Sequence, residues 1–169
     1  MPFTVWQPGM KITAGLLTAM QPPFAYKTAD KAVPGAVLQP DNHLTLPAEA
    51  GAIYVLQGHI QYTQNMATGA ANSGVRIGWL TTAGAVLNWT SRGAANITSG
   101  TTYETVLTAN GAARDFPANS GTVMTLSPTG TLATGASPAT LTLQFGVTNA
   151  AGLPATVKAG SWISITRMQ

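Results

Sequence analysis

Two β-favouring segments at the C-terminal end limit the fold of this chain most strongly. Residues 140–148 alternate between apolar and polar side chains, and a period of two is typical of a strand with one buried face. The apolar positions are Leu141, Leu143, Phe145 and Val147. Residues 160–167 (Gly-Ser-Trp-Ile-Ser-Ile-Thr-Arg) favour β structure almost to the last residue. We therefore expect the end of the chain to be an integral strand of a sheet.

Short apolar segments separated by Gly, Pro, Asn and Thr continue this pattern from Tyr26 onward. Candidate strands are 36–39, 43–46, 52–62, 75–80, 86–90, 102–107, 122–126, 140–148 and 162–167. A helical period long enough to cover a sheet is missing. The pattern predicts an all-β fold, an antiparallel jelly-roll sandwich of about eight strands. Segments 91–101, 108–121 and 127–139 are expected to be exposed connections at its ends.

The length and composition are consistent with one domain whose surface is poor in charge. The 169 residues suffice for one domain with a full core, but not for two of ordinary size. Only 8% of the residues are charged, against about a quarter in an ordinary soluble domain. Hydroxyls, amides, backbone groups or neighbouring subunits must therefore cover the surface. Cysteine is absent, which excludes disulfides, thiolate catalysis and cysteine-bound zinc.

Charge and hydropathy also restrict the partners. The eight Lys and Arg residues are scattered and the net charge is only +3, so no concentrated basic patch for nucleic acid is expected. No apolar run is long enough to cross a membrane, and the N-terminus lacks the layout of a signal peptide. We expect a protein that is made and kept in the cytoplasm, or that leaves the cell by lysis. The sequons at Asn88 and Asn96 are then chance matches in a Thr-rich chain.

Residues 1–25 differ from the rest and predict an N-terminal arm, followed by the β domain over 26–169. Pro8-Gly9 is a turn signal, and Thr13 can cap one or two helical turns that end at Pro22-Pro23. So short a helix is not stable alone in water, and its apolar side chains must dock on a surface. Two surfaces remain open, the arm's own domain or a partner. The residues expected to make the contact are Trp6, Ile12, Leu16, Leu17 and Met20.

The candidate strand over 52–62 changes character along its length. Residues 53–56 (Ile-Tyr-Val-Leu) are apolar on both faces, and then Gln57, His59 and Gln61 alternate with small or apolar residues. A strand that is buried on both faces at one end suits a sheet partly covered by another subunit. In a symmetric oligomer, three copies of His59 could meet near the axis.

Candidate catalytic and metal-binding residues are few, and we expect a protein that is not an enzyme and holds no cofactor. Asp41-Asn42-His43 has the residue types of a hydrolase dyad or a metal pair, but no nucleophile elbow or further ligand accompanies it. A polar turn leading into a strand explains it better. The five acids stand far apart in the sequence, which disfavours paired carboxylates for glycoside hydrolysis. They are residues 30, 41, 49, 104 and 115.

Two further motifs have structural interpretations. Arg114-Asp115-Phe116 resembles a cell-adhesion tripeptide without its glycine, and we interpret it as a local ion pair in a loop. The four tryptophans, at 6, 79, 89 and 162, have rings that could stack on sugars. Trp79 alternates with Val75 and Ile77, so we expect it in the core.

Two sets of motifs match patterns found in one group of proteins. The first is Trp6-x-Pro8-Gly9-x-x-Ile12-Thr13-Ala14-x-Leu16-Leu17-x-x-Met20-Gln21-Pro22, which resembles the start of small virion proteins of tailed bacteriophages, especially those of actinobacteria. The second is Pro47-x-x-Ala50-Gly51-Ala52-x-Tyr54, Gly78-Trp79 and Gly160-Ser161-Trp162-Ile163-Ser164-Ile165-x-Arg167. These motifs are similar to the trimeric C1q/TNF-like jelly rolls of phage exterior proteins.

The resemblance implies a homotrimer on the virion exterior, assembled in the host cytoplasm, with the arm fastened to the major capsid protein or to tail proteins. Because the chain has no fibrous shaft, a capsid decoration (cement) protein that stabilises the shell is the first expectation. The alternative is a minor tail protein or receptor-binding tail-tip protein that contacts host cell-wall glycan. Residues expected in the trimer interface or the core are Tyr54, His59, Phe145 and Trp162.

Overall fold

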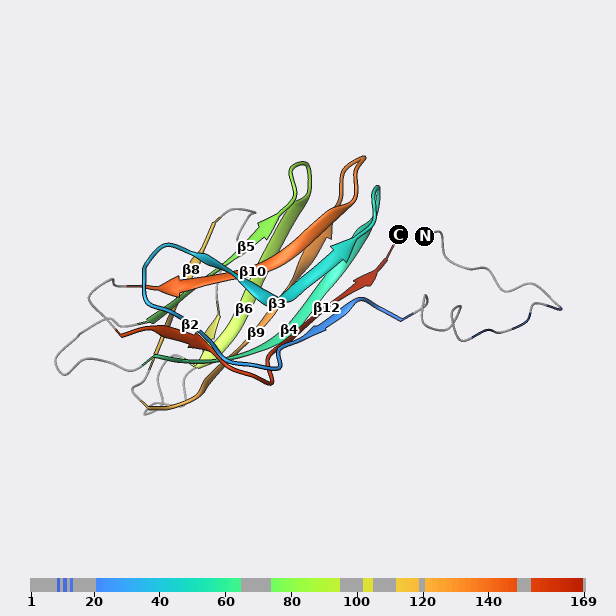
Figure 1. Cartoon of the computed structure of the whole chain (residues 1–169). Helices are drawn as coiled ribbons and strands as arrows, with labels where there is room; N and C mark the ends of the chain where they lie inside the picture. The colour runs from blue at the N-terminus through green and yellow to red at the C-terminus, as the bar shows by residue number, and fades with distance from the viewer. Residues whose placement is uncertain are drawn as a thin grey trace.

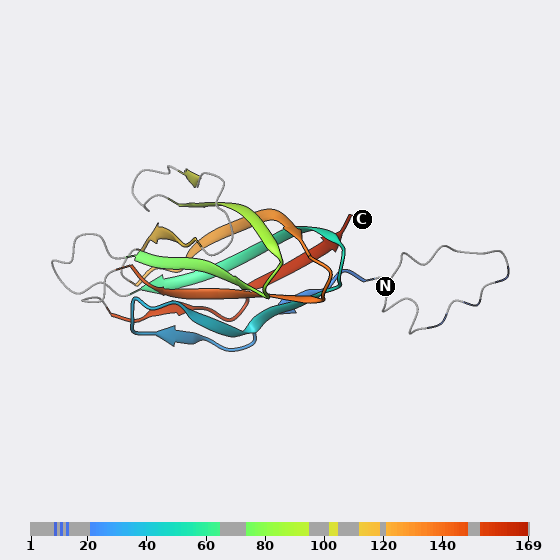
Figure 2. The same cartoon turned by 90° about the horizontal axis from the view of Figure 1, so that it is seen from above.

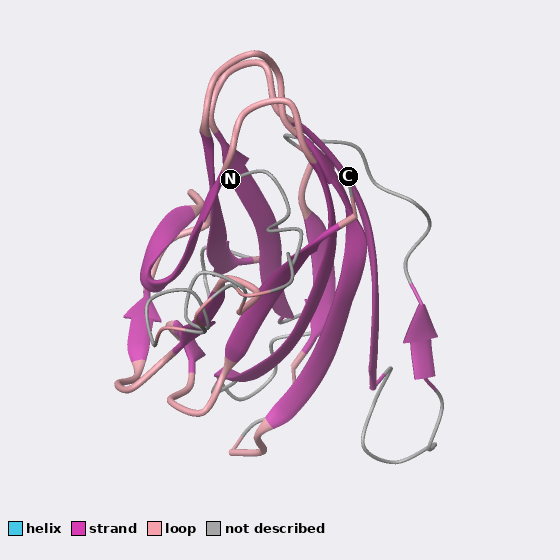
Figure 3. Ribbon diagram, turned by 90° about the vertical axis from the view of Figure 1, so that its right-hand side faces the viewer, coloured by secondary structure: helices cyan, strands magenta, loops and turns pink. Residues whose placement is uncertain are grey.

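The computed structural model describes residues 9, 11, 13, 21–64, 74–94, 102–104, 112–118, 121–148 and 153–168. All regular elements in these residues are strands, as the all-β prediction requires (Figure 3). They form two antiparallel sheets that pack face to face, a β-sandwich (Figures 1 and 2). The predicted arm residues Trp6, Ile12, Leu16, Leu17 and Met20, and the predicted helical turns around them, lie outside the described residues.

The larger sheet has eight strands and the smaller sheet has four. The larger sheet contains β1 (Phe24–Tyr26), β2 (Lys31–Val33), β4 (Ile53–Gln64), β6 (Val86–Ala94), β7 (Thr102–Glu104), β9 (Met124–Ala133), β11 (Ala155–Val157) and β12 (Trp162–Arg167). The smaller sheet contains β3 (Gln39–Ala48), β5 (Gly74–Thr81), β8 (Arg114–Pro117) and β10 (Ala139–Val147). The main path of the larger sheet is β1-β12-β4-β9-β6-β7, and that of the smaller sheet is β3-β10-β5-β8.

The pairing of the strands is nested along the chain. β1 pairs with β12, β3 with β10, β4 with β9, and β5 with β8, always antiparallel. Such nesting describes one long antiparallel ribbon that is wrapped around a core, which is the jelly-roll arrangement of two Greek keys. The C-terminal strand β12 lies between β1 and β4. Residues 162–167 therefore form an integral strand of the larger sheet, as their β-favouring pattern predicts.

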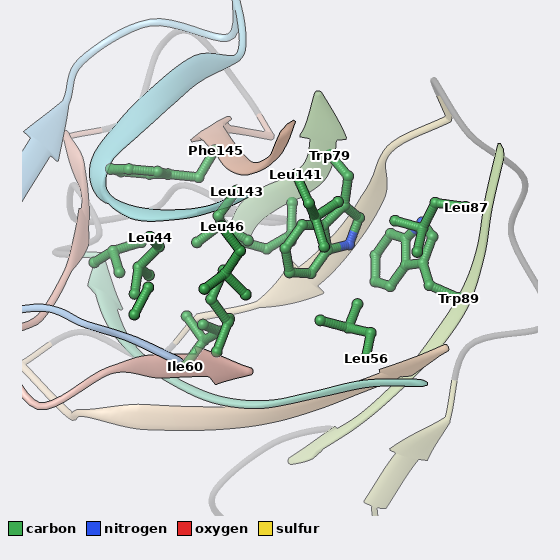
Figure 4. Packing of buried hydrophobic residues seen from close by; sticks show 14 of the residues in the cluster. Leu44, Leu46, Leu56, Ile60, Trp79, Leu87, Trp89, Leu141, Leu143 and Phe145 are labelled. Carbon is green, nitrogen blue, oxygen red and sulfur yellow. The ribbon is translucent and has the colours of Figure 1, made fainter. Parts of the chain in front are cut away.

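The core lies between the two sheets and takes alternate residues from each strand. In β10 the predicted row Leu141, Leu143, Phe145 and Val147 is fully buried. Figure 4 shows side chains of both sheets meeting there, with Ile60 from β4 facing Leu46 from β3. Trp79 of β5 and Trp89 of β6 meet edge to face, with ring centroids 6.1 Å apart. The core position predicted for Trp79 is confirmed.

Several strands differ from the predicted ones. The predicted strand 43–46 is part of the longer strand β3, which begins at Gln39, so residues 36–38 of the predicted strand 36–39 are not in a strand. β9 begins at Met124 and continues to Ala133 through residues expected to form a connection. Pro40 and Pro47 disfavour a continuous strand in the sequence. β3 is nevertheless continuous because it is an edge strand, where a proline whose nitrogen faces solvent costs no ladder hydrogen bond. β1, β2 and β11 have three residues each, too few to show a period.

The outer side of the smaller sheet is partly covered by its own chain. The backbone of residues 35–37 crosses β10 at Gly146, where an added Cβ would lie 3.0 Å from the Gly35 carbonyl oxygen. Val147 N donates a hydrogen bond to the same oxygen (3.0 Å). Beside it, Leu38 packs over Gly78 of β5. Residues of this chain therefore cover part of the outer side of the smaller sheet.

Candidate interaction surface

The outer face of the larger sheet is defined here as the outward side chains of β1, β12, β4, β9 and β6. Along β4 the even-numbered residues from Tyr54 to Gln64 are buried and the odd-numbered residues from Ile53 to Thr63 point outward. Residues in register on the neighbouring strands extend these odd positions into rows across the sheet. This face is broad, and the smaller sheet lies on its other side.

An aromatic cluster lies at the β1 edge of the outer face. It consists of Phe24, Tyr26 and Trp162. Tyr26 is directly opposite Trp162 in the β1–β12 register. The rings of Phe24 and Trp162 are stacked with centroids 5.8 Å apart, a contact worth about 0.5–1.5 kcal/mol beyond the area it buries. Phe24 is nevertheless 59% exposed and Tyr26 53% exposed, so the cluster presents aromatic surface to its surroundings.

An apolar row crosses the opposite end of the outer face. It consists of Ile53 on β4, Ala133 on β9 and Val86 on β6, which are paired in register. Val86 is 51% exposed, and Ile53 is also exposed. Met168, which follows β12, lies beside this row because its N–H donates to the Ile53 carbonyl oxygen (2.8 Å). Its side chain is exposed too.

Uncharged polar residues fill the area between the aromatic cluster and the apolar row. Gln57 is opposite Ser164 on one side and Thr129 on the other, and Thr131 lies between Val55 and Asn88. Among the outward positions of these five strands, Arg92 on β6 is the one charged residue. Because amides and hydroxyls are cheaper to desolvate than charges, this face can be covered by another molecule at low electrostatic cost.

The four residues predicted for the trimer interface or the core divide into two pairs. Tyr54 and Phe145 are in the core. The Tyr54 hydroxyl accepts a hydrogen bond from Glu49 N (2.9 Å), and burial raises the pKa of this phenol while the charge of Arg167 partly lowers it. His59 and Trp162 lie opposite each other on the outer face, both partly buried. Only this second pair is available to another subunit.

The prediction that Asp41-Asn42-His43 forms a turn leading into a strand is wrong, because all three residues belong to β3. Asp41 lies inside β3, where the pairing with β10 shifts register, and its carboxylate is buried against Lys27 with Nζ and Oδ2 2.6 Å apart. Sequence reasoning missed Lys27. One signal was present, because alternation places Lys27 on the same side of the chain as the buried Ala25.

The loop predicted at Arg114-Asp115-Phe116 is wrong, because these residues form β8. Asp115 binds Arg76 of β5 through two hydrogen bonds (2.7 and 2.9 Å), which raises the pKa of that guanidinium. Phe116 is buried in the core. The strand has only four residues, of which two are charged and one is proline, so the sequence carries no strand signal there.

Two further ion pairs involve charged residues away from the outward positions of the outer face. Asp30 accepts hydrogen bonds from Lys158 Nζ and from Ala159 N (2.7 Å), and these contacts, with the Lys158 bond the larger effect, hold the pKa of Asp30 below its usual value. Arg167 binds Glu49 (2.7 Å). Within the described ranges no three His, Asp or Glu side chains converge as metal ligands. None of the described residues forms a helix long and apolar enough to span a membrane.

The fold and this surface define the class of the molecule: an antiparallel β-sandwich with one broad, charge-poor outer face. Comparison with known proteins adds no narrower identity, since no protein-family model matches the chain and no curated protein matches it.

Proposed function

We propose that this chain is a non-enzymatic structural protein of a bacteriophage virion, a homotrimer on the particle exterior whose subunits meet through the outer face of the larger sheet. One observation carries the self-association. The apolar row and the aromatic cluster lie on the same charge-poor face and are exposed in the single chain. Contiguous exposed apolar surface marks interaction sites, and homo-oligomer interfaces are depleted in charge.

The virion role follows from the resemblance of the N-terminal and C-terminal motifs together with this sandwich. In the proposal the arm, with Trp6, Ile12, Leu16, Leu17 and Met20, contacts the major capsid protein, and the trimer decorates and stabilises the shell. The composition supports an assembled protein, because a chain with 8% charged residues has few side chains that favour full solvation.

The molar mass in solution tests the self-association. Light scattering of the full chain should give the mass of three subunits, and Val86→Arg should give a single subunit because it places an unpaired charge in the interface. Leu80→Arg is the matched control, since Leu80 is as exposed as Val86 (50% against 51%) but lies on the smaller sheet. A wild-type protein that stays monomeric at all concentrations contradicts the trimer.

A truncated chain tests the anchoring arm. Deleting residues 1–22 keeps Pro23, whose carbonyl oxygen accepts a hydrogen bond from Ile165 N (3.1 Å), so the sandwich should remain intact. The truncated protein should have the wild-type molar mass and no longer bind phage particles. Binding at the wild-type level would remove the arm from the proposal. Antibody labelling of particles distinguishes a position on the head from one on the tail.

The aromatic cluster favours a second candidate function, a tail-associated protein that binds host cell-wall glycan. Aromatic rings stack on the apolar faces of sugar rings, and Gln57 and Ser164 supply uncharged hydrogen-bonding groups one row from Trp162. This function predicts binding to purified host cell walls that Trp162→Ala abolishes without changing the molar mass. If Trp162→Ala instead dissociates the oligomer, the cluster belongs to the subunit interface.

A further inference from the structure

Lys27 and Asp41 are the only charged residues that are buried in the described part of the chain. Both side chains are 0% exposed, and Nζ and Oδ2 are 2.6 Å apart. Three further ion pairs, Arg76–Asp115, Lys158–Asp30 and Arg167–Glu49, are partly exposed. The buried pair also joins the two sheets, because Lys27 directly follows β1 and Asp41 belongs to β3.

Backbone hydrogen bonds hold both partners in place. Lys27 N donates to the Ser161 carbonyl oxygen (2.8 Å), and Gly160 N donates to the Lys27 carbonyl oxygen (2.9 Å). On the other side, Asp41 Oδ1 accepts from His43 N (2.9 Å) and Leu44 N (3.0 Å). One oxygen of the carboxyl group therefore faces the amine while two N–H donors point at the other.

The hydrogen bonds of the pair are unevenly matched. A lysine ammonium has three N–H donors, but Asp41 Oδ2 is the only side-chain or backbone acceptor that the described residues offer to Lys27 Nζ. Buried donors without acceptors and buried charges are both unfavourable. A secondary amide has one N–H and no charge, so an amide between these two side chains removes most of the mismatch.

We propose that Lys27 and Asp41 condense to an intramolecular isopeptide bond. A proton passes from Nζ to Oδ2, which leaves a neutral amine beside a carboxylic acid. Nζ then attacks Cγ, and negative charge develops on Oδ1 between the N–H groups of His43 and Leu44, the arrangement of an oxyanion hole. A second proton moves from the nitrogen to Oδ2, the Cγ–Oδ2 bond breaks, and water leaves.

The reaction balances without any further reactant. One ammonium and one carboxylate give one amide and one water, and no group is oxidised or reduced. The fold supplies the rate enhancement by holding the amine against the carboxyl group, since a fixed intramolecular geometry replaces a bimolecular encounter. The N–H groups of His43 and Leu44 polarise the Cγ–Oδ1 bond. The proposed reaction therefore needs no third carboxyl group to activate Asp41.

The bond would connect the first strand of the larger sheet to the first strand of the smaller one. β1 has only three residues and lies at a sheet edge, so a force applied to the preceding segment would otherwise be borne by few hydrogen bonds. With the isopeptide bond, both sheets share this load. The chain has no cysteine, so this amide would supply the covalent cross-link that a disulfide supplies in other proteins.

The mass of the denatured full-length protein tests the proposal. We expect a mass below that of the sequence by one water molecule. Trypsin should not cleave after Lys27, because its amine is acylated, and digestion should yield peptide 12–31 joined to peptide 32–76. Fragmentation should locate the link between Lys27 and Asp41. A water loss that increases while the folded protein is incubated supports the same reaction.

The chain contains its own control in Lys158 and Asp30, a Lys–Asp ion pair that is partly exposed. In the same digest trypsin should cleave after Lys158, and peptide 115–158 should not be joined to peptide 12–31, which contains Asp30. The Lys27→Arg variant keeps a cation but cannot form the amide, and it should have its full sequence mass; if it does not fold, the wild-type peptide map still decides.

Two results would overturn the proposal. One is a wild-type protein that keeps the full sequence mass after prolonged incubation in the folded state. The other is a water loss that maps elsewhere, for example to a cyclic imide at an aspartate.

Discussion

Trp162 of β12 lies directly opposite His59 of β4 on the outward side of the larger sheet. Tyr26 of β1 extends the same row on the other side of Trp162. The row therefore joins the aromatic cluster at the sheet edge to the polar centre of the outer face.

If subunits meet through this face, a charge at His59 should separate them. His59→Glu should weaken self-association by at least about tenfold, because an unpaired buried charge costs more than the roughly 1.4 kcal/mol that a tenfold change represents. His59→Gln, which keeps an uncharged hydrogen-bonding side chain, should leave the oligomer intact. Sedimentation velocity over a range of concentrations measures both. Equal masses for the two variants would restrict the contact to the apolar row.

The edge-to-face contact between Trp79 and Trp89 should contribute a measurable coupling to stability. Both Nε1 atoms are buried and have no hydrogen-bond partner among the described residues, so replacement by leucine removes packing and none of the described hydrogen bonds. A cycle of Trp79→Leu, Trp89→Leu and the double variant should give a coupling of about 0.5–1.5 kcal/mol in urea unfolding. Strictly additive effects would show that the ring contact adds nothing beyond buried area.

Asp30 should make stability depend on pH at the acid end. Its folded pKa lies below the ordinary 3.8, mainly through the Lys158 hydrogen bond. The carboxylate therefore contributes stability that is fully present above the unfolded pKa and is lost as pH falls through the lower folded value. Asp30→Asn should lower the melting temperature at neutral pH. When melting temperature is plotted against pH, the wild-type and variant curves should converge below pH 3.8. A difference that persists unchanged in strong acid would contradict this linkage.

Gly146 should not tolerate a side chain. An added Cβ would lie 3.0–3.3 Å from the carbonyl oxygens of residues 35–37, and overpacking of this kind costs about 1–3 kcal/mol. Gly146→Ala should therefore unfold at lower urea concentration than the wild type. Gly35→Ala is the control in the same contact, because its Cβ would meet only Val37 N at 3.9 Å. Equal stability of the two variants would show that residues 35–37 move aside freely.

The long strands were predictable because each carries its own period. The alternation of residues 140–148 marks one buried face, and β10 has its odd-numbered apolar residues in the core. β8 could not be found in this way, since its strand state comes from pairing with β5 and not from its own residues. The same holds for the three-residue strands, which exist only beside their partners.

The candidate site was predictable only in part. His59 and Trp162 were singled out from separate strands, and the β12–β4 register places them side by side. Phe24, Tyr26 and Val86 were missed, because exposure of an apolar residue depends on which face of the sheet remains uncovered. Lys27 and Asp41 are 14 residues apart in sequence, and nothing local connects them.

The sequence by itself determined the β class, the absence of cysteine chemistry and the core row of β10, because these depend on composition and on a local period of two. Only the tertiary structure decided that the C-terminal strand lies between β1 and β4, that residues 35–37 cover the smaller sheet, and that Lys27 meets Asp41. Such contacts depend on how distant segments pair. No local sequence pattern predicts them, because the two residues come together only when the sheets form.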